Sequence, residues 1–381
     1  MKQQADFVVI GAGIAGASAA YELAAHGSVL LLEREALPGH HTTGRSAAFW
    51  VANYGSQAVR ALTAASREFL VNPPPGFSES KLVESNPMLW IARPDQEASL
   101  EREAVAAAEA GAVVEKLSAA EAEALCPVLR PGTVSRALCE PGALHIDVAT
   151  LLEGYLRGLR KRGGRLLAKL AIGAIDFRAA CWVLETSEGT IEAPVLVDAA
   201  GAWADRVATL GGVKTIGLRP LRRTAITFDP PTGSDARSWP CVVDVDAAFY
   251  FKPEGGQLLA SPCDETPMEP CDVVPDDYEI ALVADLVQRA TTLEIRHIRR
   301  SWAGLRNFVS DRGPVIGEGA AHPGFFWLAG LGGFGIMTSP AAARALAHLV
   351  TQKELPDELR ARGVVASDYA PDRPALRVDA G

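Results

Sequence analysis

Three glycines near the N-terminus have the spacing of a phosphate-binding turn. Gly11, Gly13 and Gly16 fit the pattern G-x-G-x-x-G, which binds through backbone N–H groups rather than through reactive side chains. The first glycine permits a tight turn, the second lets the backbone approach a pyrophosphate, and the third lets a helix pack closely on a strand. Glu33 lies 17 residues after Gly16, close to where an acid accepts hydrogen bonds from an adenosine ribose. We therefore expect a dinucleotide to bind here.

The elements that such a site requires are predicted around these residues. Residues 7–10 form a short, wholly apolar run, which is typical of a parallel strand buried on both faces. Residues 17–25 continue as a helix pattern, and the start of that helix offers free N–H groups to an anion. A second apolar strand is expected over 29–32 and ends at Glu33. This order of strand, turn, helix and strand makes the glycine pattern more specific than it is alone.

The segment after Glu33 favours one cofactor over another. Residues 40–48, with the sequence HHTTGRSAA, form a polar loop without the helical periodicity of a plain nicotinamide-binding unit. Such a loop suits backbone contacts to a bulkier cofactor, which favours FAD. His40 and His41 are adjacent, but no third ligand stands at a fitting spacing, so we expect no metal site.

Two further segments are predicted to complete the same domain. Residues 195–203 are typical of a buried strand that runs into small residues. A strand over 325–329 precedes a second glycine-rich loop at 330–335, for which an ordinary glycine turn is the alternative. Thr338-Ser339-Pro340 supplies N-cap chemistry and an N1 proline for a helix over 341–350. In a flavoenzyme, that helix start would stabilise negative charge near N1 and O2 of the reduced ring.

Composition limits the class of protein. The chain has 381 residues, of which 48% are hydrophobic and 22% charged, so it can bury a large core in two domains or one elaborate one. A net charge of −9 argues against a nucleic-acid partner. Six scattered cysteines form no CxxC pair, which argues against a zinc ribbon. Without a signal peptide or a transmembrane run, we expect a cytoplasmic protein, with peripheral membrane contact left open.

Several segments together resemble the D-amino-acid oxidase and glycine oxidase group of FAD flavoproteins. They are FVVIGAGIAGASAA from residue 7, LEREALPGHHTTGRSAA from residue 32, VLVDAAGAWAD from residue 195, WAGLRNF from residue 302 and GGFGIMTS from residue 332. Within that group the chain is most similar to the bacterial FAD-dependent D-arginine dehydrogenases, also over residues 61–67 and 72–77. The resemblance covers nearly the whole chain, and it is more specific for the family than for the substrate.

The resemblance implies an α/β architecture, with a Rossmann-like FAD-binding domain of the glutathione-reductase type and a mixed β-sheet substrate-binding domain. The implied boundaries are 1–79, 141–215 and 301–366 for the FAD-binding domain, and 80–140 and 216–300 for the substrate-binding domain. The apolar run 88–92, the Ala/Glu-rich helical stretch 96–126 and the β-like runs 224–228 and 249–251 agree with this. Residues 367–381 are expected to be a disordered tail.

The resemblance also implies which residues contact a substrate. Arg223 and Arg306 match positions whose guanidinium groups bind a carboxylate through paired, charge-assisted hydrogen bonds. Tyr54 and Tyr250 match positions that line the substrate cavity. We expect these four residues to be catalytic, since hydride transfer to flavin N5 needs positioning and electrostatics rather than a triad or a carboxylate dyad. The other expected substrate contacts are Phe49, Met88 and Gly333.

The expected FAD contacts come from the two glycine-rich loops and the segments between them. FAD is expected to bind non-covalently, because no cysteine lies close in sequence to Arg306 or the loop 332–335, and Phe49 stands where some relatives have histidine. The expected FAD-binding residues are Gly11, Gly13, Ile14, Ala15, Gly16, Glu33, Arg34, His41, Thr42, Thr43, Gly44, Arg45, Ser46, Ala47, Ala48, Ile172, Ala200, Gly201, Gly332, Gly333, Phe334, Gly335, Ile336, Met337 and Thr338.

Two positions depart from the D-arginine dehydrogenase pattern. Met88 stands where that pattern has a carboxylate for the substrate guanidinium, and Phe49 stands where it has a histidine beside the flavin. The pocket is therefore expected to favour apolar side chains. Glu84, four residues before Met88, would restore the charge if the register of the strand shifted.

The expected function is oxidative deamination of small-molecule D-amino acids, with hydride transfer to FAD and hydrolysis of the imine to a 2-oxo acid and ammonia. A quinone-like or other acceptor, rather than oxygen, is expected to reoxidise the flavin, and the oligomeric state is left open. Within the family, a sarcosine or glycine oxidase activity is the nearest alternative. A nicotinamide-dependent dehydrogenase and a non-catalytic FAD-containing interaction protein are the alternatives outside it.

Overall fold

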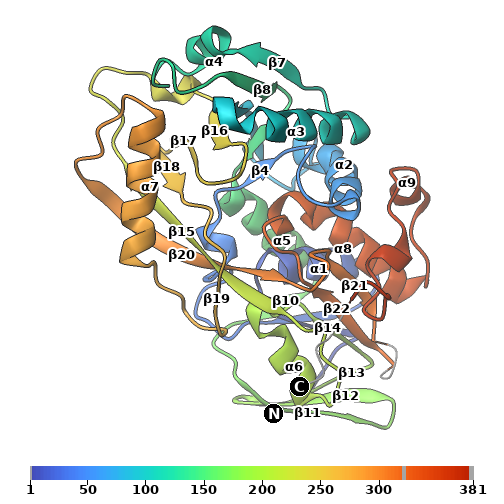
Figure 1. The fold of residues 1–381 in the computed structure, drawn as a ribbon. Coiled ribbons are helices and arrows are strands. Elements are labelled where there is room, and N and C mark those ends of the chain that lie inside the picture. Colours follow the sequence, from blue (N-terminus) through green and yellow to red (C-terminus); the bar gives the residue numbers. More distant parts are fainter. Residues whose placement is uncertain (1, 320–322, 377–381) are drawn as a thin grey trace.

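Two large sheets organise the molecule. The computed structural model describes residues 2–319 and 323–376 of the chain. Figure 1 shows the six-stranded sheet in the lower part of the view, close to helices α1, α5 and α8, and the nine-stranded sheet above it. In the part of the chain so described, no helix is both long and apolar enough to cross a membrane.

The six-stranded sheet is mostly parallel, and it carries the glycine-rich turns. In spatial order its strands are β10 (Arg165–Leu167), β3 (Val29–Leu32), β2 (Phe7–Ile10), β14 (Val195–Asp198), β22 (Phe325–Ala329) and β21 (Val315–Glu318). Only the edge strand β21 runs antiparallel to its neighbour. Strands β2, β3 and β22 have the predicted bounds, because an all-apolar run of this length is stable only where both faces of a sheet are covered.

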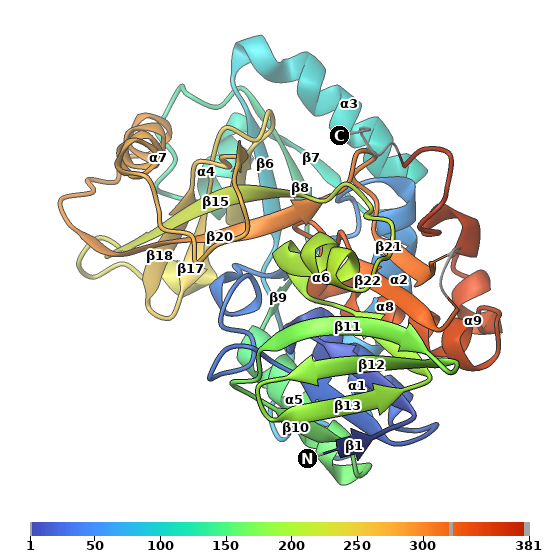
Figure 2. The same ribbon diagram turned by 90° about the horizontal axis from the view of Figure 1, so that it is seen from below.

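Helices cover one face of this sheet, and a smaller sheet covers the other. The helices are α1 (Ile14–Leu23), α2 (Gln57–Val71), α5 (Val148–Lys161) and α8 (Gly335–Thr351). On the opposite face lie α6 (Ala204–Leu210) and a four-stranded sheet of β1 (Lys2–Gln4), β13 (Gly189–Ala193), β12 (Cys181–Thr186) and β11 (Ile172–Arg178). Figure 2 shows these four strands side by side. The layers confirm the α/β class.

Helix α8 begins six residues earlier than the sequence predicts. It starts at Gly335 rather than Ala341, so Pro340 lies inside the helix. Proline has no N–H to donate to the carbonyl of Ile336, but the Ser339 hydroxyl donates to that oxygen at 3.0 Å. The N–H of Ala341 donates to the hydroxyl of Ser66 on α2, at 3.1 Å. These two side chains replace the hydrogen bonds that the proline disrupts.

The nine-stranded sheet is mixed. Its strands are β19 (Thr266–Pro267), β15 (Arg219–Phe228), β18 (Gln257–Ser261), β17 (Tyr250–Glu254), β16 (Cys241–Asp244), β6 (Met88–Ala92), β8 (Arg136–Glu140) and β7 (Glu115–Ser118), with β20 (Ile298–Phe308) paired to β15. Strands β16 and β6 pair in parallel, and the others are antiparallel. Because β20 joins this sheet, residues 301–308 lie beside the predicted substrate domain; the domain boundaries themselves stay a prediction.

Helices α3 (Glu97–Glu109), α4 (Ala119–Leu125) and α7 (Asp277–Ala290) pack on the nine-stranded sheet. The predicted helical stretch 96–126 is therefore wrong in its middle, where β7 separates α3 from α4. Gly111, with φ +67°, follows the end of α3. Ser118 and Glu121 form a capping box that starts α4.

A small sheet and an ordered C-terminal segment complete the fold. Strands β4 (Phe49–Trp50), β9 (Leu144–Ile146) and β5 (Val83–Ser85) form the small sheet, and α9 spans Asp357–Arg360. The expectation of a disordered tail is wrong for residues 367–376. Tyr369 is 2% exposed and donates to the carbonyl of Ala58 at 2.8 Å, and Arg373 pairs with Asp311. The composition of the tail does not indicate these two contacts. Residues 377–381, the rest of the predicted tail, lie outside the described residues.

Candidate active site

A cavity of about 1200 Å³ extends from the glycine turn after β2 to the inner face of the nine-stranded sheet. Four of the predicted FAD-binding residues do not line it: Gly16, Gly44, Phe334 and Thr338. The others do, and so do all seven predicted substrate contacts. Whether each residue binds as predicted stays a prediction, but the fold brings these distant segments to one cavity.

Backbone atoms pack so closely against the β2–α1 turn that two of its positions require glycine. Gly11 has φ +97°, and a Cβ atom there would lie 2.6 Å from the carbonyl oxygen of Ala199. A Cβ atom at Gly16 would lie 1.8 Å from the carbonyl oxygen of Gly11, so Gly16 allows packing rather than facing the cavity. Helix α1 begins at Ile14, earlier than predicted, and has no acid in its first turn. The N–H of Ile14 donates to Thr43, and no carboxylate in the first turn would repel an anion at the neighbouring N–H groups.

Glu33 is held at the end of β3 with its carboxylate in the cavity lining. It accepts hydrogen bonds from the N–H groups of Ala12 and Glu35, both at 2.8 Å. These two bonds fix the carboxylate beside the glycine turn and leave lone pairs for ribose hydroxyl groups. Arg34 also lines the cavity.

The loop over residues 40–48 ties the two large sheets together. Thr43 accepts a hydrogen bond from Ile14 N at 2.9 Å, and Thr42 donates to the carbonyl of Leu305 on β20 at 2.7 Å. Arg45 donates to the carbonyls of Val273 and Ala303, both at 3.0 Å, and also contacts Asp272. Arg45 is a predicted FAD contact, but its guanidinium hydrogen-bonds to β20 and to the segment between β19 and α7.

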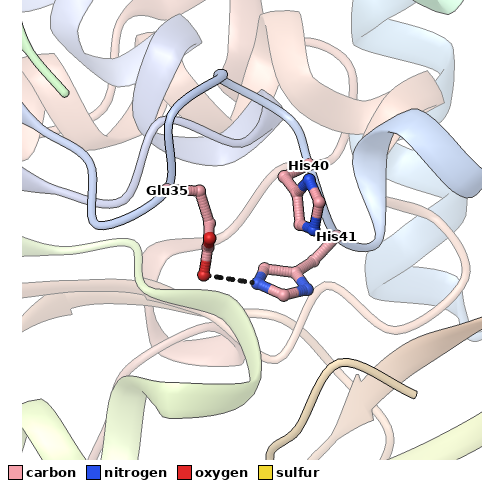
Figure 3. A group of neighbouring side chains, drawn as sticks. All are labelled: Glu35, His40 and His41. Carbon is pink, nitrogen blue, oxygen red and sulfur yellow. Dashed lines mark hydrogen bonds and ion pairs between the residues drawn. The ribbon is translucent and has the colours of Figure 1, made fainter. Parts of the chain in front are cut away.

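His40 and His41 lie beside a third polar side chain that the sequence argument did not consider. His41 Nε2 lies 3.2 Å from a carboxylate oxygen of Glu35, as the dashed line in Figure 3 shows. His40 Nε2 lies 3.7 Å from Asp272, which is already paired with Arg45. One ligand atom from each of Glu35, His40 and His41 falls within 4.8 Å of the others. Glu35 and the two histidines also line the cavity expected to hold FAD, so a metal ion and FAD would compete for them.

The polar atoms and apolar walls of the cavity fit FAD. The side chains of His41 and Asn307 line it, and the described residues offer no hydrogen-bond partner to His41 Nδ1 or Asn307 Oδ1. A bound cofactor that carries donors and acceptors would satisfy them. The cavity is also lined by five side chains that were not among the predicted contacts: Leu170, Trp203, Arg206, Val207 and Leu210. Trp203 lies in the motif that begins at residue 195, and the other four lie outside the motifs named above.

Arg306 and Tyr54 meet at the substrate end of the cavity. Nη1 of Arg306 donates to the Tyr54 hydroxyl at 3.3 Å. A Cβ atom at Gly333 would lie 2.7 Å from the same Nη1, so only glycine leaves the guanidinium its place. Phe334, at the start of α8, packs its ring against Tyr54 with centroids 4.9 Å apart. Thr338 is fully buried and donates to the carbonyl of Phe334, which gives it a structural role.

Tyr250 and Arg223 complete this end of the cavity. Burial raises the pKa of Tyr250, against the opposing effect of Arg306, so its phenol stays protonated and available as a donor. Arg223 donates to the carbonyl of Asp264 at 3.0 Å and to the carboxylate of Glu265 at 3.2 Å. Glu265 also pairs with Arg312 at 2.7 Å. The two arginines predicted to bind a carboxylate therefore differ in their surroundings, because only Arg223 has a carboxylate partner among the described residues.

The remaining walls of this end are mainly apolar. Met88 and Trp90 point from β6 toward the cavity, because alternate residues of a strand share a face. Phe49, Val51, Cys241 and Val243 also line it. Glu84 does not: it is exposed on β5, paired with His145, and β6 keeps a regular register with β8 and β16. The structure thus gives no support to Glu84 as a replacement for the missing acid.

Comparison with known proteins identifies the family. The model of the family described as FAD dependent oxidoreductase, DAO, matches residues 6–349. The chain belongs to this family. Among curated relatives, the mitochondrial sarcosine dehydrogenase of Mus musculus is 26% identical to this oxidoreductase over 369 residues. The match covers 91% of this chain and 39% of that protein, so the chain spans about two fifths of the relative's length.

Relatives of similar length are also found. Glycine oxidase of Geobacillus kaustophilus strain HTA426 is 25% identical over 380 residues, with 93% of this chain and 95% of that protein covered. The crystal structure of L-proline dehydrogenase from P. horikoshii has a TM-score of 0.86 at 21% identity, with 98% of both chains covered. Glycine oxidase from Geobacillus kaustophilus has a TM-score of 0.82 at 23% identity, with 92% and 96% covered. These structures share the fold.

The predicted fold class, the FAD cofactor and the family are thus confirmed. The oxidoreductase is an FAD-dependent enzyme with the α/β fold and mixed sheets of its family. Membership of this family argues against the two alternatives outside it, a nicotinamide-dependent dehydrogenase and a non-catalytic FAD protein. The similarity to glycine oxidase and sarcosine dehydrogenase confirms the predicted group, whereas a particular likeness to D-arginine dehydrogenases is not shown.

Proposed function

We propose that this oxidoreductase deaminates D-amino acids oxidatively, with Arg306 as the anchor of the substrate carboxylate. The observation that carries the proposal is the placement of Arg306 in the cavity beside Tyr54 and Gly333, without a carboxylate partner among the described residues. A guanidinium left without an anion in such a site suits a carboxylate ligand. FAD, when bound, supplies the hydride acceptor for the α-hydrogen of the substrate.

The chain's own side chains would then position the substrate. Arg306 fixes the carboxylate, and the Tyr54 hydroxyl, already within 3.3 Å of Arg306, fixes the orientation of the guanidinium. Tyr250 donates a hydrogen bond to the substrate, since burial keeps its phenol protonated. Arg223 adds to the positive potential at the substrate end of the cavity, but its ion pair with Glu265 reduces that contribution. Once the substrate ammonium has lost a proton to water, the neutral amine supports transfer of the α-hydrogen as hydride, and positioning of this kind accelerates that step.

The walls formed by Phe49, Met88 and Trp90 favour substrates with an uncharged side chain. Each methylene buried against them contributes about 0.8 kcal/mol, whereas a buried guanidinium without a carboxylate loses its ion pair and its hydration. We therefore expect D-leucine, D-methionine and D-phenylalanine to react better than D-arginine and D-lysine. The preference for D-enantiomers and for a quinone-like acceptor over oxygen rests on family resemblance.

The second candidate is an amine oxidase or dehydrogenase of the sarcosine or glycine type. Similarity to sarcosine dehydrogenase and glycine oxidase supports it. A substrate without a side chain would leave the apolar walls unfilled, and for this reason we prefer the first candidate. A D-arginine dehydrogenase would need an acid to replace the one absent at Met88. Glu103 and Asp244 also line the cavity, but Asp244 is paired with Arg93 and Glu103 has the positive charge of Arg60 beside it.

Anaerobic reduction of the bound flavin distinguishes these candidates. Bleaching of the flavin absorbance by D-leucine or D-methionine, but not by their L-enantiomers, is the expected result. Faster bleaching by sarcosine or glycine would favour the second candidate. Met88→Glu is expected to shift the ratio of kcat/KM toward D-arginine, and Met88→Leu serves as its matched control. If the unsubstituted enzyme prefers D-arginine, the assignment of Met88 is wrong.

A further inference from the structure

One part of the cavity lining is polar rather than apolar. It consists of Asn53, in the loop after β4, Arg60 on α2 and Glu103 on α3; we name these three residues the distal cluster. All three line the same cavity as Met88 and Trp90. Helix α3 packs on β6, and its residues Leu100 and Ala104 share one apolar cluster with these two β6 side chains. The distal cluster therefore borders the apolar walls.

The hydrogen bonds of the distal cluster are incomplete. Nδ2 of Asn53 donates to the Glu103 carboxylate at 2.8 Å and to the Glu103 carbonyl at 3.3 Å. Oδ1 of Asn53 has no partner among the described residues, although the residue is only 3% exposed. Arg60 donates from Nη1 to the carbonyl of Ala106 at 3.2 Å, while its buried Nε has no partner among those residues. Unpaired buried polar atoms are costly, and a ligand would remove that cost.

The charges of the distal cluster nearly cancel. Burial raises the pKa of Glu103, and the positive charge of Arg60 opposes that rise. Glu140 is a second buried carboxyl group close to Glu103, and burial together with the charge of Glu103 raises its pKa, which disfavours a further negative charge here. A cation would be attracted by Glu103 but repelled by Arg60, and an anion would face the reverse. A neutral group with both donors and acceptors suits this surrounding best.

We propose that the distal cluster binds a terminal carboxamide on the substrate side chain, which rests on the proposed function and narrows its substrate class. The carboxamide N–H groups would donate to Asn53 Oδ1 and to the second carboxylate oxygen of Glu103. Its carbonyl would accept from Arg60 Nε. The methylenes of the side chain would lie against Met88 and Trp90. D-Glutamine and D-asparagine are therefore the substrates that satisfy both the walls and their polar border.

The connection to the carboxylate anchor is short along the chain. Asn53 is followed directly by Tyr54, whose hydroxyl lies 3.3 Å from Arg306 Nη1. Ala52, on the other side of Asn53, donates its N–H to Glu140 on β8 at 2.7 Å, which fixes this loop to the substrate sheet. One ordered loop thus presents a contact for the carboxylate end and a contact for the side-chain end of the same ligand.

Non-reacting ligands test the distal cluster apart from the chemistry. Glutaramate carries a carboxylate and a carboxamide but no amine; 5-methylhexanoate has the same shape without polar atoms at its end, and glutarate has a second charge. Each is titrated into the FAD-loaded enzyme, and the dissociation constant is read from the perturbed visible spectrum of the flavin. We expect glutaramate to bind at least about tenfold more tightly than glutarate.

Substitutions assign the preference to these side chains. Glu103→Gln is expected to weaken glutaramate about tenfold, because a charged acceptor is replaced by a neutral one, and to leave 5-methylhexanoate within about twofold. Arg60→Met is the second variant, with the same expected direction. Glu109→Gln, at an exposed position of the same helix α3, is the matched control and should change neither ligand. Flavin content and thermal midpoint report on folding.

Each possible result supports or overturns the carboxamide assignment. Equal binding of glutaramate and glutarate, or a Glu103→Gln variant that weakens all three ligands alike, would overturn the carboxamide assignment. A preference for D-arginine over D-glutamine in flavin reduction that Glu103→Gln abolishes would make the distal cluster a cation site instead, which also overturns it. If glutaramate binds as expected but no D-amino acid reduces the flavin, the carboxamide site stands and the proposed reaction fails. If D-leucine reduces the flavin but glutaramate binds no more tightly than glutarate, the proposed reaction stands and the carboxamide site fails.

Discussion

Arg306 and Arg223 occupy the same cavity but have different electrostatic surroundings. Arg223 is paired with Glu265, whereas Arg306 donates a hydrogen bond to the phenol of Tyr54 and forms no ion pair among the described residues. We expect Arg306→Met to lower kcat/KM by at least about tenfold, since a charged hydrogen-bond partner contributes about 1.5–3 kcal/mol. Arg223→Met should have a smaller effect. Both values are measured at equal flavin content, and a larger loss for Arg223→Met would contradict the assignment.

The phenol of Tyr250 gives a prediction on pH dependence. Its pKa lies above the ordinary value of 10.0, with burial as the main cause, so this group stays protonated as the pH rises to 10. Its deprotonation therefore cannot produce a fall in kcat/KM below that pH. We expect Tyr250→Phe to lower kcat/KM while the pH profile between 8 and 10 keeps its shape. A profile that loses an alkaline limb in the variant would show that Tyr250 titrates in this range.

Individual residues were predictable where the backbone itself makes the site. Spacing alone predicts the places of Gly11 and Glu33 beside the cavity, where the structure puts them, and their contacts with FAD stay a prediction. The pairing of Arg223 with Glu265, by contrast, depends on a contact between residues 42 positions apart in different strands and loops. Asn53 and Glu103 are 50 positions apart. No local pattern indicates such pairs.

At the scale of elements, the loop before α8 determines where Arg306 lies. Gly333→Ala would place a Cβ atom 2.7 Å from Arg306 Nη1, so the guanidinium must move. We expect the dissociation constant of a carboxylate ligand to rise by at least about tenfold, with FAD retained, because a charge-assisted pair is lost.

The control for this variant is Gly142→Ala, since a Cβ atom at Gly142 would meet nothing within 4 Å. The dissociation constant is measured from the flavin spectrum in both variants. Unchanged carboxylate binding in Gly333→Ala would mean that Arg306 can rearrange without loss, and would remove the reason for glycine at this position.

The elements themselves were predictable to different degrees. Strands β2, β3 and β22 were placed correctly because complete burial requires an apolar run with sharp ends. The start of α8 was not, because Ser66, which accepts the N–H of Ala341, lies on another helix, 275 positions away. The break between α3 and α4 depends on pairing of β7 with β8, and no composition argument contains that pairing.

At the scale of the whole molecule, folding brings Cys263 into the cavity with Arg306. No cysteine lies close to Arg306 in the sequence, but the fold places Cys263 in the same cavity lining. The expectation of non-covalent FAD still stands on a different ground. Burial raises the pKa of the Cys263 thiol, which keeps it protonated and weakens it as a nucleophile.

We therefore expect acid precipitation of the holoenzyme to release all of the flavin into the supernatant. The absorbance of the pellet and of the supernatant is the measurement. Flavin that stays with the washed pellet, and that is lost from the pellet in Cys263→Ser, would show a covalent bond to this cysteine. Cys126→Ser, at a buried position outside the cavity lining, is the control.

The loop over residues 40–48 makes the resistance of the protein to proteolysis depend on bound FAD. Its side chains line the FAD cavity and also bind Val273, Ala303 and Leu305 of the substrate half. A bound cofactor stabilises only the folded form, so loss of FAD weakens the link between the halves as well as the cavity. We expect a protease to cut the apoprotein faster than the holoprotein, first near residue 272. Riboflavin shortage in a cell would then lower the amount of this enzyme through degradation, before any shortage of substrate is felt.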